Sequence, residues 1–128
     1  MTQEERDLLF KDLCSRLPYG VKLHCYSHSI MCIGPYTLNT IVLDRIFNKH
    51  TEYAPFDEAK PYLFPLSNMT EEQKKEYYAL CDESITEWGT PLYFDTVESI
   101  DWLNAHHFDF RGLIPMGLAI NAIGLNVY

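Results

Sequence analysis

The chain has 128 residues, 47% of them apolar and 22% charged, which predicts one globular domain and excludes a disordered segment. Of its formal net charge of −8, residues 71–101 carry most, because nine acidic residues there stand against two lysines. No basic surface is available to neutralise phosphates, so we expect no direct nucleic-acid partner. The polar, acidic start and the lack of an apolar run of about eighteen residues predict a cytoplasmic protein with no membrane partner.

The first predicted element is an amphipathic helix over residues 3–17. Thr2 and Glu5 have the spacing of a capping box, in which each side chain accepts a hydrogen bond from the backbone N–H of the other residue. The apolar residues that repeat at helical spacing, and predict its buried face, are Leu9, Phe10, Leu13, Cys14 and Leu17. Pro18 and Gly20 then end the helix.

Strand patterns follow. Residues 21–25 alternate between apolar and polar side chains, which predicts a strand with one buried face. Residues 30–33 form a short apolar segment. Residues 37–47 are rich in β-branched side chains and are predicted as the longest strand.

The strand region ends with a proline-flanked segment. Residues 48–60 are polar and predict a loop. Residues 62–66 are predicted as an edge strand or extended arm, because Pro61 and Pro65 each lack a backbone donor. Together these segments predict a small bent antiparallel sheet or an SH3-like partial barrel.

A long second helix is predicted over residues 70–88. Thr70 and Gln73 have the spacing of a capping box at its start, and Gly89 and Pro91 follow its end. The apolar residues at helical spacing are Tyr77, Leu80, Cys81, Ile85 and Trp88. The opposite side carries a stripe of glutamates, namely Glu72, Glu76, Glu83 and Glu87.

A third helix is predicted to begin near Asp95 or Thr96. Its predicted inner face consists of Val97, Ile100, Leu103 and Phe108. Residues 112–123 predict a short helix followed by an irregular tail. The order of elements predicts an α+β fold in a single domain over residues 1–128. Its three parts are an N-terminal helix (1–18), a small sheet (20–66) and two to three C-terminal helices (70–123).

The cysteines and histidines give a weak metal signal. In a reducing cytosol we expect Cys14, Cys25, Cys32 and Cys81 to be free, buried thiols. The one cluster that resembles metal ligands adds His24 and His28 to Cys25 and Cys32. Its spacing fits no familiar zinc site, and strand alternation would turn His24 and Cys25 to opposite faces. We therefore expect no metal and no cofactor.

Three segments carry a resemblance to known sequences: KDLCSRLPYGVK (11–22), KPYLFPLSNMTEE (60–72) and DWLNAHHFDFRGLI (101–114). The chain resembles small uncharacterised proteins of Bacteroides-type gut bacteria and their phages. The resemblance implies an origin in a phage or mobile element. It implies no activity, because the family has none assigned.

Two hypotheses for function remain. No catalytic signature is present, so we expect no catalytic residues and lean against an enzyme. Aromatic residues make up 14% of the chain and, with the acidic stripe, favour a protein-interaction module. Its candidate surface comprises Glu72, Glu76, Glu83, Glu87, Tyr36 and Tyr62. The alternative is a small enzyme or ligand-binding domain with a site at His106, His107, Asp109 and Arg111. For Arg111 we favour a structural role, with Asp101 or Asp109 as partner.

Overall fold

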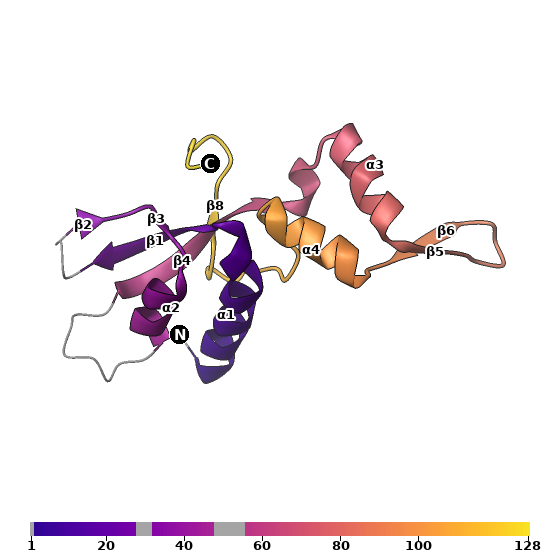
Figure 1. Cartoon of the computed structure of the whole chain (residues 1–128). Coiled ribbons are helices and arrows are strands. Elements are labelled where there is room, and N and C mark those ends of the chain that lie inside the picture. The colour runs from indigo at the N-terminus through magenta and orange to yellow at the C-terminus, as the bar shows by residue number, and fades with distance from the viewer. Residues whose placement is uncertain (1, 28–31, 48–55) are drawn as a thin grey trace.

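A computed structural model describes residues 2–27, 32–47 and 56–128, without the side chains of residues 26, 27, 32, 33, 45 and 56–58. Its helices and strands (Figure 1) are α1 (Gln3–Arg16), β1 (Lys22–Ser27), β2 (Cys32–Ile33), β3 (Tyr36–Thr37), α2 (Thr40–Phe47), β4 (Phe56–Pro65), α3 (Glu71–Leu80), β5 (Asp82–Ile85), β6 (Pro91–Phe94), α4 (Val97–Ala105), β7 (Phe108–Asp109) and β8 (Ile120–Asn121). Single 3-10 turns follow α1 and β4. The α+β class predicted from the sequence is confirmed.

Strand β4 is the centre of the main sheet. The hydrogen-bonded order is β2-β1-β4-β7, with β3 also paired to β1 and β8 to β4. Strand β4 is antiparallel to β1 and parallel to β7 and β8. The sheet is therefore mixed: the predicted antiparallel pairing holds where β1 pairs with β2, β3 and β4, but not where β4 pairs with β7 and β8.

Strand β4 contains two prolines, and the edge strand predicted from them is wrong. The strand spans Phe56–Pro65 and is central, so residues 56–60 are not a loop and residues 62–66 are not an edge strand. Residues 48–55 lie outside the described residues. Parallel pairing of β4 begins at Tyr62 and ends at Pro65. Pro61 and Pro65 thus stand at the limits of that pairing, where fewer ladder hydrogen bonds are required.

Helix α1 begins and ends as the sequence predicts. Thr2 Oγ1 accepts from the Glu5 N–H, and Glu5 Oε1 accepts from the Thr2 N–H, each at 3.1 Å. Both bonds satisfy amides that the first helical turn leaves free. Gly20 reverses the chain with a φ of 66°, a left-handed conformation that glycine adopts at little cost.

The buried face of α1 differs from the predicted one. Leu9 and Leu13 are buried in the core, but Phe10 is 44% exposed. The positions turned inward instead include two charged residues, Asp12 and Arg16, both fully buried. A periodicity analysis places such residues on the outer face because burial of a charge requires a partner from elsewhere in the chain.

Strand β1 and the residue before it contribute apolar side chains to the core. Val21, Leu23 and Cys25 are buried, whereas Lys22 and His24 are half-buried, which confirms the predicted alternation. The main apolar cluster consists of Leu9, Leu13, Val21, Leu23, Cys25, Leu38, Val42, Ile46, Ala59, Leu63, Leu113, Leu118 and Ala119. It joins α1, α2, the sheet and the C-terminal segment.

Residues 40–47 form helix α2, and the prediction of a long strand there is wrong. Leu38, Val42 and Ile46 recur every fourth residue and are all buried. The Oδ1 of Asn39 accepts from the Val42 N–H at 2.9 Å and caps the first turn. Tertiary burial of one helical face therefore outweighs the β-branched composition of the segment.

Helix α3 starts as predicted but ends at Leu80. The reciprocal bonds of the Thr70 and Gln73 capping box are present. The hydroxyl of Thr96 donates to the Leu80 carbonyl at 2.6 Å and so satisfies a group that the helix end leaves free. Cys81 is already extended, with φ −82° and ψ 155°. The predicted helix over residues 70–88 is therefore wrong in its second half.

That second half is the start of a β-hairpin. Strands β5 and β6 pair antiparallel from Asp82↔Phe94 to Ile85↔Pro91. The Thr86 N–H donates to the Thr90 carbonyl at 3.0 Å, and the Gly89 N–H donates to the Thr86 carbonyl at 2.9 Å. Gly89 has a φ of 77°. A three-residue loop ending in a left-handed glycine is a common way to close a hairpin.

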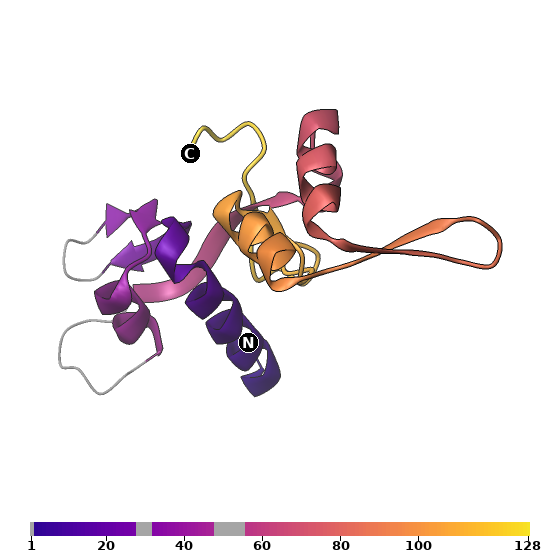
Figure 2. The same cartoon turned by 45° about the vertical axis from the view of Figure 1, so that its right-hand side comes forward.

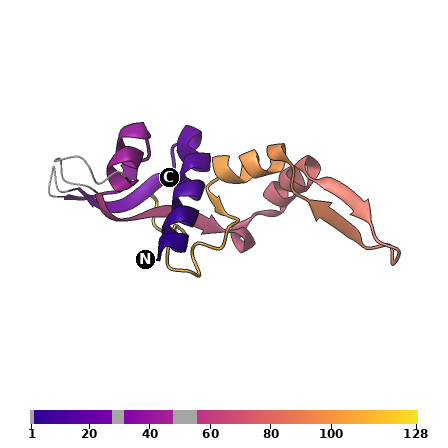
Figure 3. The same ribbon diagram turned by 90° about the horizontal axis from the view of Figure 1, so that it is seen from below.

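The last third of the chain connects the hairpin to the sheet. Thr96 and Ser99 cap α4, on which Leu103 is buried but Val97, predicted on the inner face, is 74% exposed. Residues 112–123 form turns and β8, not the predicted short helix. Figures 2 and 3 show α1, α2 and the main sheet at one end of the molecule and the β5–β6 hairpin extending from the other, beyond α3 and α4. None of the helices in the described part of the chain combines the length and apolarity needed to traverse a bilayer.

Candidate interaction surface

Arg111 belongs to a buried charge network and not to an open site. Its Nε donates to Asp12 Oδ1 at 3.2 Å, and Asp12 Oδ2 accepts from Arg16 Nε at 2.8 Å. The side chains of Asp12 and Arg16 are fully buried, and that of Arg111 is 17% exposed. Arg111 therefore ties the C-terminal segment to α1. The structural role agrees with the prediction, but its partner is Asp12 and not Asp101 or Asp109.

An aromatic ring and a backbone carbonyl complete this network. The guanidinium carbons of Arg16 and Arg111 lie 5.3 Å and 4.6 Å from the centre of the Phe110 ring. Arg16 Nη2 donates to the Phe108 carbonyl at 2.7 Å, and its Nη1 has no partner among the described atoms. The negative charge of one carboxylate thus compensates the positive charges of two guanidinium groups. The face of the Phe110 ring and the Phe108 carbonyl stabilise these charges further.

His107 is held between the C-terminus and the sheet. Its ring stacks on Tyr128, with centroids 3.9 Å apart and planes 11° apart, and its backbone carbonyl accepts from the Phe64 N–H at 2.8 Å. The pKa of His107 is lowered to about 4, first by burial and then by the charges of Arg16 and His106. The imidazole is therefore neutral at physiological pH.

His106 and Asp109 also have structural partners. The Nδ1 of His106 lies 2.9 Å from the Trp102 carbonyl, and its ring stacks on the indole at 4.1 Å. The two carboxylate oxygens of Asp109 accept from the N–H groups of Leu113 and Ile114, each at 2.9 Å, and fix the turn after β7. Each of the four residues of the alternative ligand site is thus engaged within the chain.

The two tyrosines assigned to the interaction surface lie elsewhere. Tyr62 is 7% exposed, and its Oη lies 3.0 Å from His24 Nδ1, so its place on that surface is corrected. Its carbonyl accepts from the Tyr128 hydroxyl at 2.7 Å, which in turn accepts from the Lys22 N–H at 2.8 Å. Burial raises the pKa of Tyr128 to about 12, against the lowering effects of the Lys22 N–H and the charge of Arg16. Tyr36 is half-buried and packs against the core.

The cysteines are free thiols in the part of the chain that is described. Cys14, Cys25 and Cys81 are unpaired, and Cys14 is exposed where the sequence predicts burial. Burial raises the pKa of Cys25 to about 11, which makes it a poor nucleophile. His28 and the side chain of Cys32 lie outside the described residues. Within them, no three potential ligands are arranged to hold a metal ion.

The β5–β6 hairpin gathers exposed apolar side chains. We call residues 82–94 the hairpin arm. Among the described residues, fifteen large apolar side chains are exposed, and eight of them lie between residues 78 and 97. These eight are Tyr78, Leu80, Ile85, Trp88, Leu92, Tyr93, Phe94 and Val97. Ile85 is 71% exposed and Trp88, at the tip, is 84% exposed, although the sequence predicts both in the core.

Acidic groups accompany this apolar surface. Glu72 and Glu76 lie on α3, Glu83 lies on β5 and Glu87 in the hairpin turn, and all four are exposed. The predicted stripe on one helical face is therefore corrected, although the four charges remain in one region of the molecule. The hairpin arm itself carries three acidic residues and no basic one.

The root of the hairpin arm, where β5 follows α3 and β6 leads to α4, packs against both helices. The rings of Tyr78 and Tyr93 lie 4.4 Å apart, and the Tyr77 hydroxyl donates to Asp95. The pKa of Tyr77 is raised by burial and by its bond to that carboxylate. Tyr77 also contacts Trp102 of α4, with ring centroids 5.9 Å apart. The root is thus positioned by the body of the protein, and the tip projects from it.

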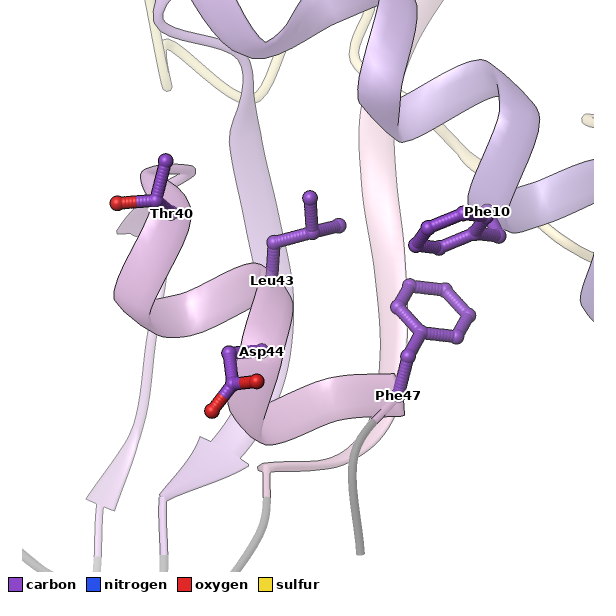
Figure 4. Close-up of a pocket in the computed structure, with 5 residues that line it drawn as sticks. All are labelled: Phe10, Thr40, Leu43, Asp44 and Phe47. Atoms are coloured by element: carbon purple, nitrogen blue, oxygen red, sulfur yellow. The ribbon is translucent and has the colours of Figure 1, made fainter.

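Open pockets occur both at the root of the hairpin arm and in the body of the protein. One of about 570 Å³ lies at the root of the hairpin arm and is lined by Asp82, Asp95, Thr96, Val97, Ile100 and Asp101. The other, of about 370 Å³, lies between α1 and α2 and is lined by Phe10, Thr40, Leu43, Asp44 and Phe47. Figure 4 shows the Phe10 ring next to the Phe47 ring in this second pocket; the contact is edge-to-face, with centroids 4.9 Å apart and planes at 74°. The first pocket combines carboxylates with an apolar wall, and the second is mainly apolar.

Comparisons with known proteins return no match: no family model, no curated protein and no solved structure is significantly similar to this chain.

The sequence contains a signal for the hairpin that helical spacing conceals. Thr86 and Thr90 bracket Gly89, and β-branched residues occupy both sides of this turn. A glycine between two short segments of β-branched and aromatic residues, here Ile85 and Thr86 before it and Thr90, Tyr93 and Phe94 after it, is typical of a hairpin. The competing pattern at residues 77, 81, 85 and 88 has the period of a helix, so only the fold reveals that Ile85 and Trp88 are on the surface.

Proposed function

We propose that this chain is a small protein-interaction module that binds a basic partner protein through the hairpin arm. The observation that carries the proposal is the concentration of exposed apolar side chains on an acidic, projecting hairpin. The resemblance to proteins of Bacteroides-type bacteria and their phages supports placing this module in a mobile element that acts in the bacterial cytoplasm.

The apolar side chains support an interface. Large exposed apolar side chains that gather in one region of a protein often mark a binding surface. Aromatic residues are enriched at the centres of interfaces, and the hairpin arm offers Trp88, Tyr93 and Phe94. A two-stranded hairpin gains little stability from such residues, because both of its faces stay in water. Their placement is better explained by a partner than by folding.

The charge selects the class of partner. Residues 71–101 carry nine acidic groups against two lysines, and a surface of that sign repels nucleic acid and anionic lipid. It attracts a protein with clustered lysine and arginine. The pocket at the root supports the same sign, because Asp82, Asp95 and Asp101 surround an apolar wall that suits the alkyl stem and cationic head of such a side chain.

The proposal is tested by photocrosslinking in the native host. A photoreactive phenylalanine replaces Trp88 in one variant and Ile41 in another, because Ile41 is a comparably exposed apolar residue (63%) on α2, away from the hairpin arm. We expect the Trp88 position, and not the Ile41 position, to crosslink one basic protein. Purified with that protein, Glu83→Gln/Glu87→Gln should weaken binding about tenfold at low salt, with a smaller loss at high salt.

Three results would overturn the proposal. The first is equal crosslinking from both positions, which would mean that the hairpin arm is not selective. The second is an acidic partner, and the third is an adduct with lipid or nucleic acid alone.

A further inference from the structure

The backbone of the hairpin arm has two edges, and they are not equivalent. In an antiparallel pair, hydrogen-bonded and non-hydrogen-bonded residue pairs alternate along the strands. The bond from the Thr86 N–H to the Thr90 carbonyl marks the pair 86↔90 as hydrogen-bonded. By alternation from that pair, the backbone groups of Ser84↔Leu92 point inward, whereas those of Ile85↔Pro91 and Glu83↔Tyr93 point outward.

Proline breaks the symmetry of these edges. The outward positions of β6 are Pro91 and Tyr93, and Pro91 has no N–H to donate. The outward positions of β5 are Glu83 and Ile85, both of which offer a donor and an acceptor. Strand β5 pairs with β6 and with no other strand of the described part of the chain. Strand β5 therefore presents an open edge, and β6 a blunted one.

We propose that the partner binds by adding one extended segment, rich in lysine or arginine, to the open edge of β5. This inference rests on the proposed function and specifies its mode. Side chains of an added strand alternate between the two faces of the hairpin, beside Asp82 on one face and Glu83 on the other. Opposite charges on neighbouring strands stabilise pairing. An apolar residue of the same segment lies beside Ile85, which is 71% exposed.

The same charges argue against a second copy as the occupant. A β5 strand from another molecule would bring Asp82 and Glu83 of both copies into one small sheet, within regions that are each strongly acidic. Like charges on neighbouring strands are destabilising. Acidic residues on an exposed edge are a common device against self-association, and here they also select a basic strand.

The test uses the whole protein and an N-terminally acetylated peptide that repeats Lys-Lys-Val-Val, so that lysines and valines occur on both faces of the added strand. The control is the same peptide with glutamate in place of lysine. Hydrogen exchange is followed by NMR at single amides. We expect the lysine peptide to slow exchange at Glu83 and Ile85 by about tenfold or more, because these outward N–H groups gain a carbonyl acceptor. Exchange at Tyr93, on the blunted edge, should not change. The glutamate peptide should have no effect.

Two variants separate backbone pairing from side-chain contact. Ile85→Pro removes one outward donor without changing the charge, and Ile85→Ala removes the side chain but keeps the donor. We expect Ile85→Pro to bind the lysine peptide at least about tenfold more weakly than Ile85→Ala does. The inward Ser84 amide reports whether the hairpin is intact in each variant, and exchange in the unaltered protein tests the inference without either substitution.

The outcomes separate the mode of binding from the proposed function. Equal affinity of the two variants, protection at Tyr93 instead of β5, or no binding of the lysine peptide overturns strand addition. Strand addition by a basic segment is also overturned if exchange at Glu83 and Ile85 slows as the protein concentration rises without any peptide. The open edge of β5 would then be covered by a second copy of the chain. The crosslinking at Trp88 is independent of all these results and judges the proposed function by itself.

Discussion

The two ends of the molecule use charged and aromatic residues in opposite ways. At the body end, Asp12 and Arg16 are fully buried and Phe110 lies against two guanidiniums, so charge and ring contribute to the fold. On the hairpin arm, Glu83 and Trp88 are both exposed and contribute little to it. The comparison shows that residue type does not reveal a binding surface. What does so is the exposure of large apolar side chains gathered in one region.

The two regions should also differ in local stability. The body packs α1, α2, the main sheet and the C-terminal segment around one apolar cluster. The hairpin arm is held at its root by contacts of Tyr77, Tyr78 and Thr96. Segments with few buried contacts open more readily than the core. We therefore expect substitutions in the body to change stability and substitutions at the arm to change binding.

The largest expected effect is at Asp12. Asp12→Asn leaves Arg16 buried without its carboxylate and should lower the free energy of unfolding by about 3–5 kcal/mol, measured by urea denaturation. Arg111→Ala removes the partly exposed partner of Asp12 and should lower the free energy of unfolding by a smaller amount. If Asp12→Asn were no more harmful than Trp88→Ala, the division between the two regions would be wrong.

A double variant sharpens this prediction. Asp12→Leu combined with Arg16→Met replaces the buried pair with apolar groups and should recover most of the stability lost in Asp12→Leu alone. Recovery would show that the cost arises from the uncompensated charge of Arg16. No recovery would indicate that the bond from Arg16 to the Phe108 carbonyl is the larger contribution.

An intermediate effect is expected from His107 as the pH falls. Its pKa is about 4 in the folded chain, below the ordinary value of 6.5, so the unfolded chain binds the proton more readily. The stability that His107 contributes is therefore complete above about pH 6.5 and is lost as the pH falls towards 4. We expect the free energy of unfolding to fall by about 1–2 kcal/mol. This is less than the full pKa shift implies, because the imidazole ring is partly solvated.

The control for His107 is His107→Asn, because asparagine tolerates the φ of 62° at this position and does not titrate. Thermal unfolding measured across this pH range should show a smaller acid-induced loss in the variant than in the unaltered chain. An unchanged pH profile would assign the acid sensitivity to other groups.

The smallest expected effect on stability is at the tip of the hairpin arm. Trp88 is 84% exposed, so Trp88→Ala should change the free energy of unfolding by less than about 0.5 kcal/mol. Leu63→Ala, at a fully buried position of β4, should cost about 2–5 kcal/mol and serves as the matched control. Chemical denaturation of both variants provides the measurement. A large loss at Trp88 would mean that the arm is part of the core.

The local features of the fold could be predicted from the sequence. The capping boxes at Thr2 and Thr70, the end of α1 at Gly20 and the alternation of β1 all depend on residues within a few positions of one another. Such features are set by hydrogen bonds and backbone geometry that the neighbouring residues decide. The acidic character of residues 71–101, and with it the basic chemistry proposed for the partner, also follows from the sequence.

Tertiary structure decided what lies inside and what lies outside. Residues 40–47 form a helix because this conformation buries Val42 and Ile46 on one face in the core. Strand β4 is central because β7 and β8, which lie far along the chain, pair with it. Asp12 could be buried because Arg111 reaches it across 99 positions of sequence. Ile85 and Trp88 share their spacing with a buried helical face, yet the chain turns at Gly89 and nothing in the described structure covers them. Burial depends on contacts between distant segments, and a periodic pattern in the sequence records spacing but not the presence of a neighbour.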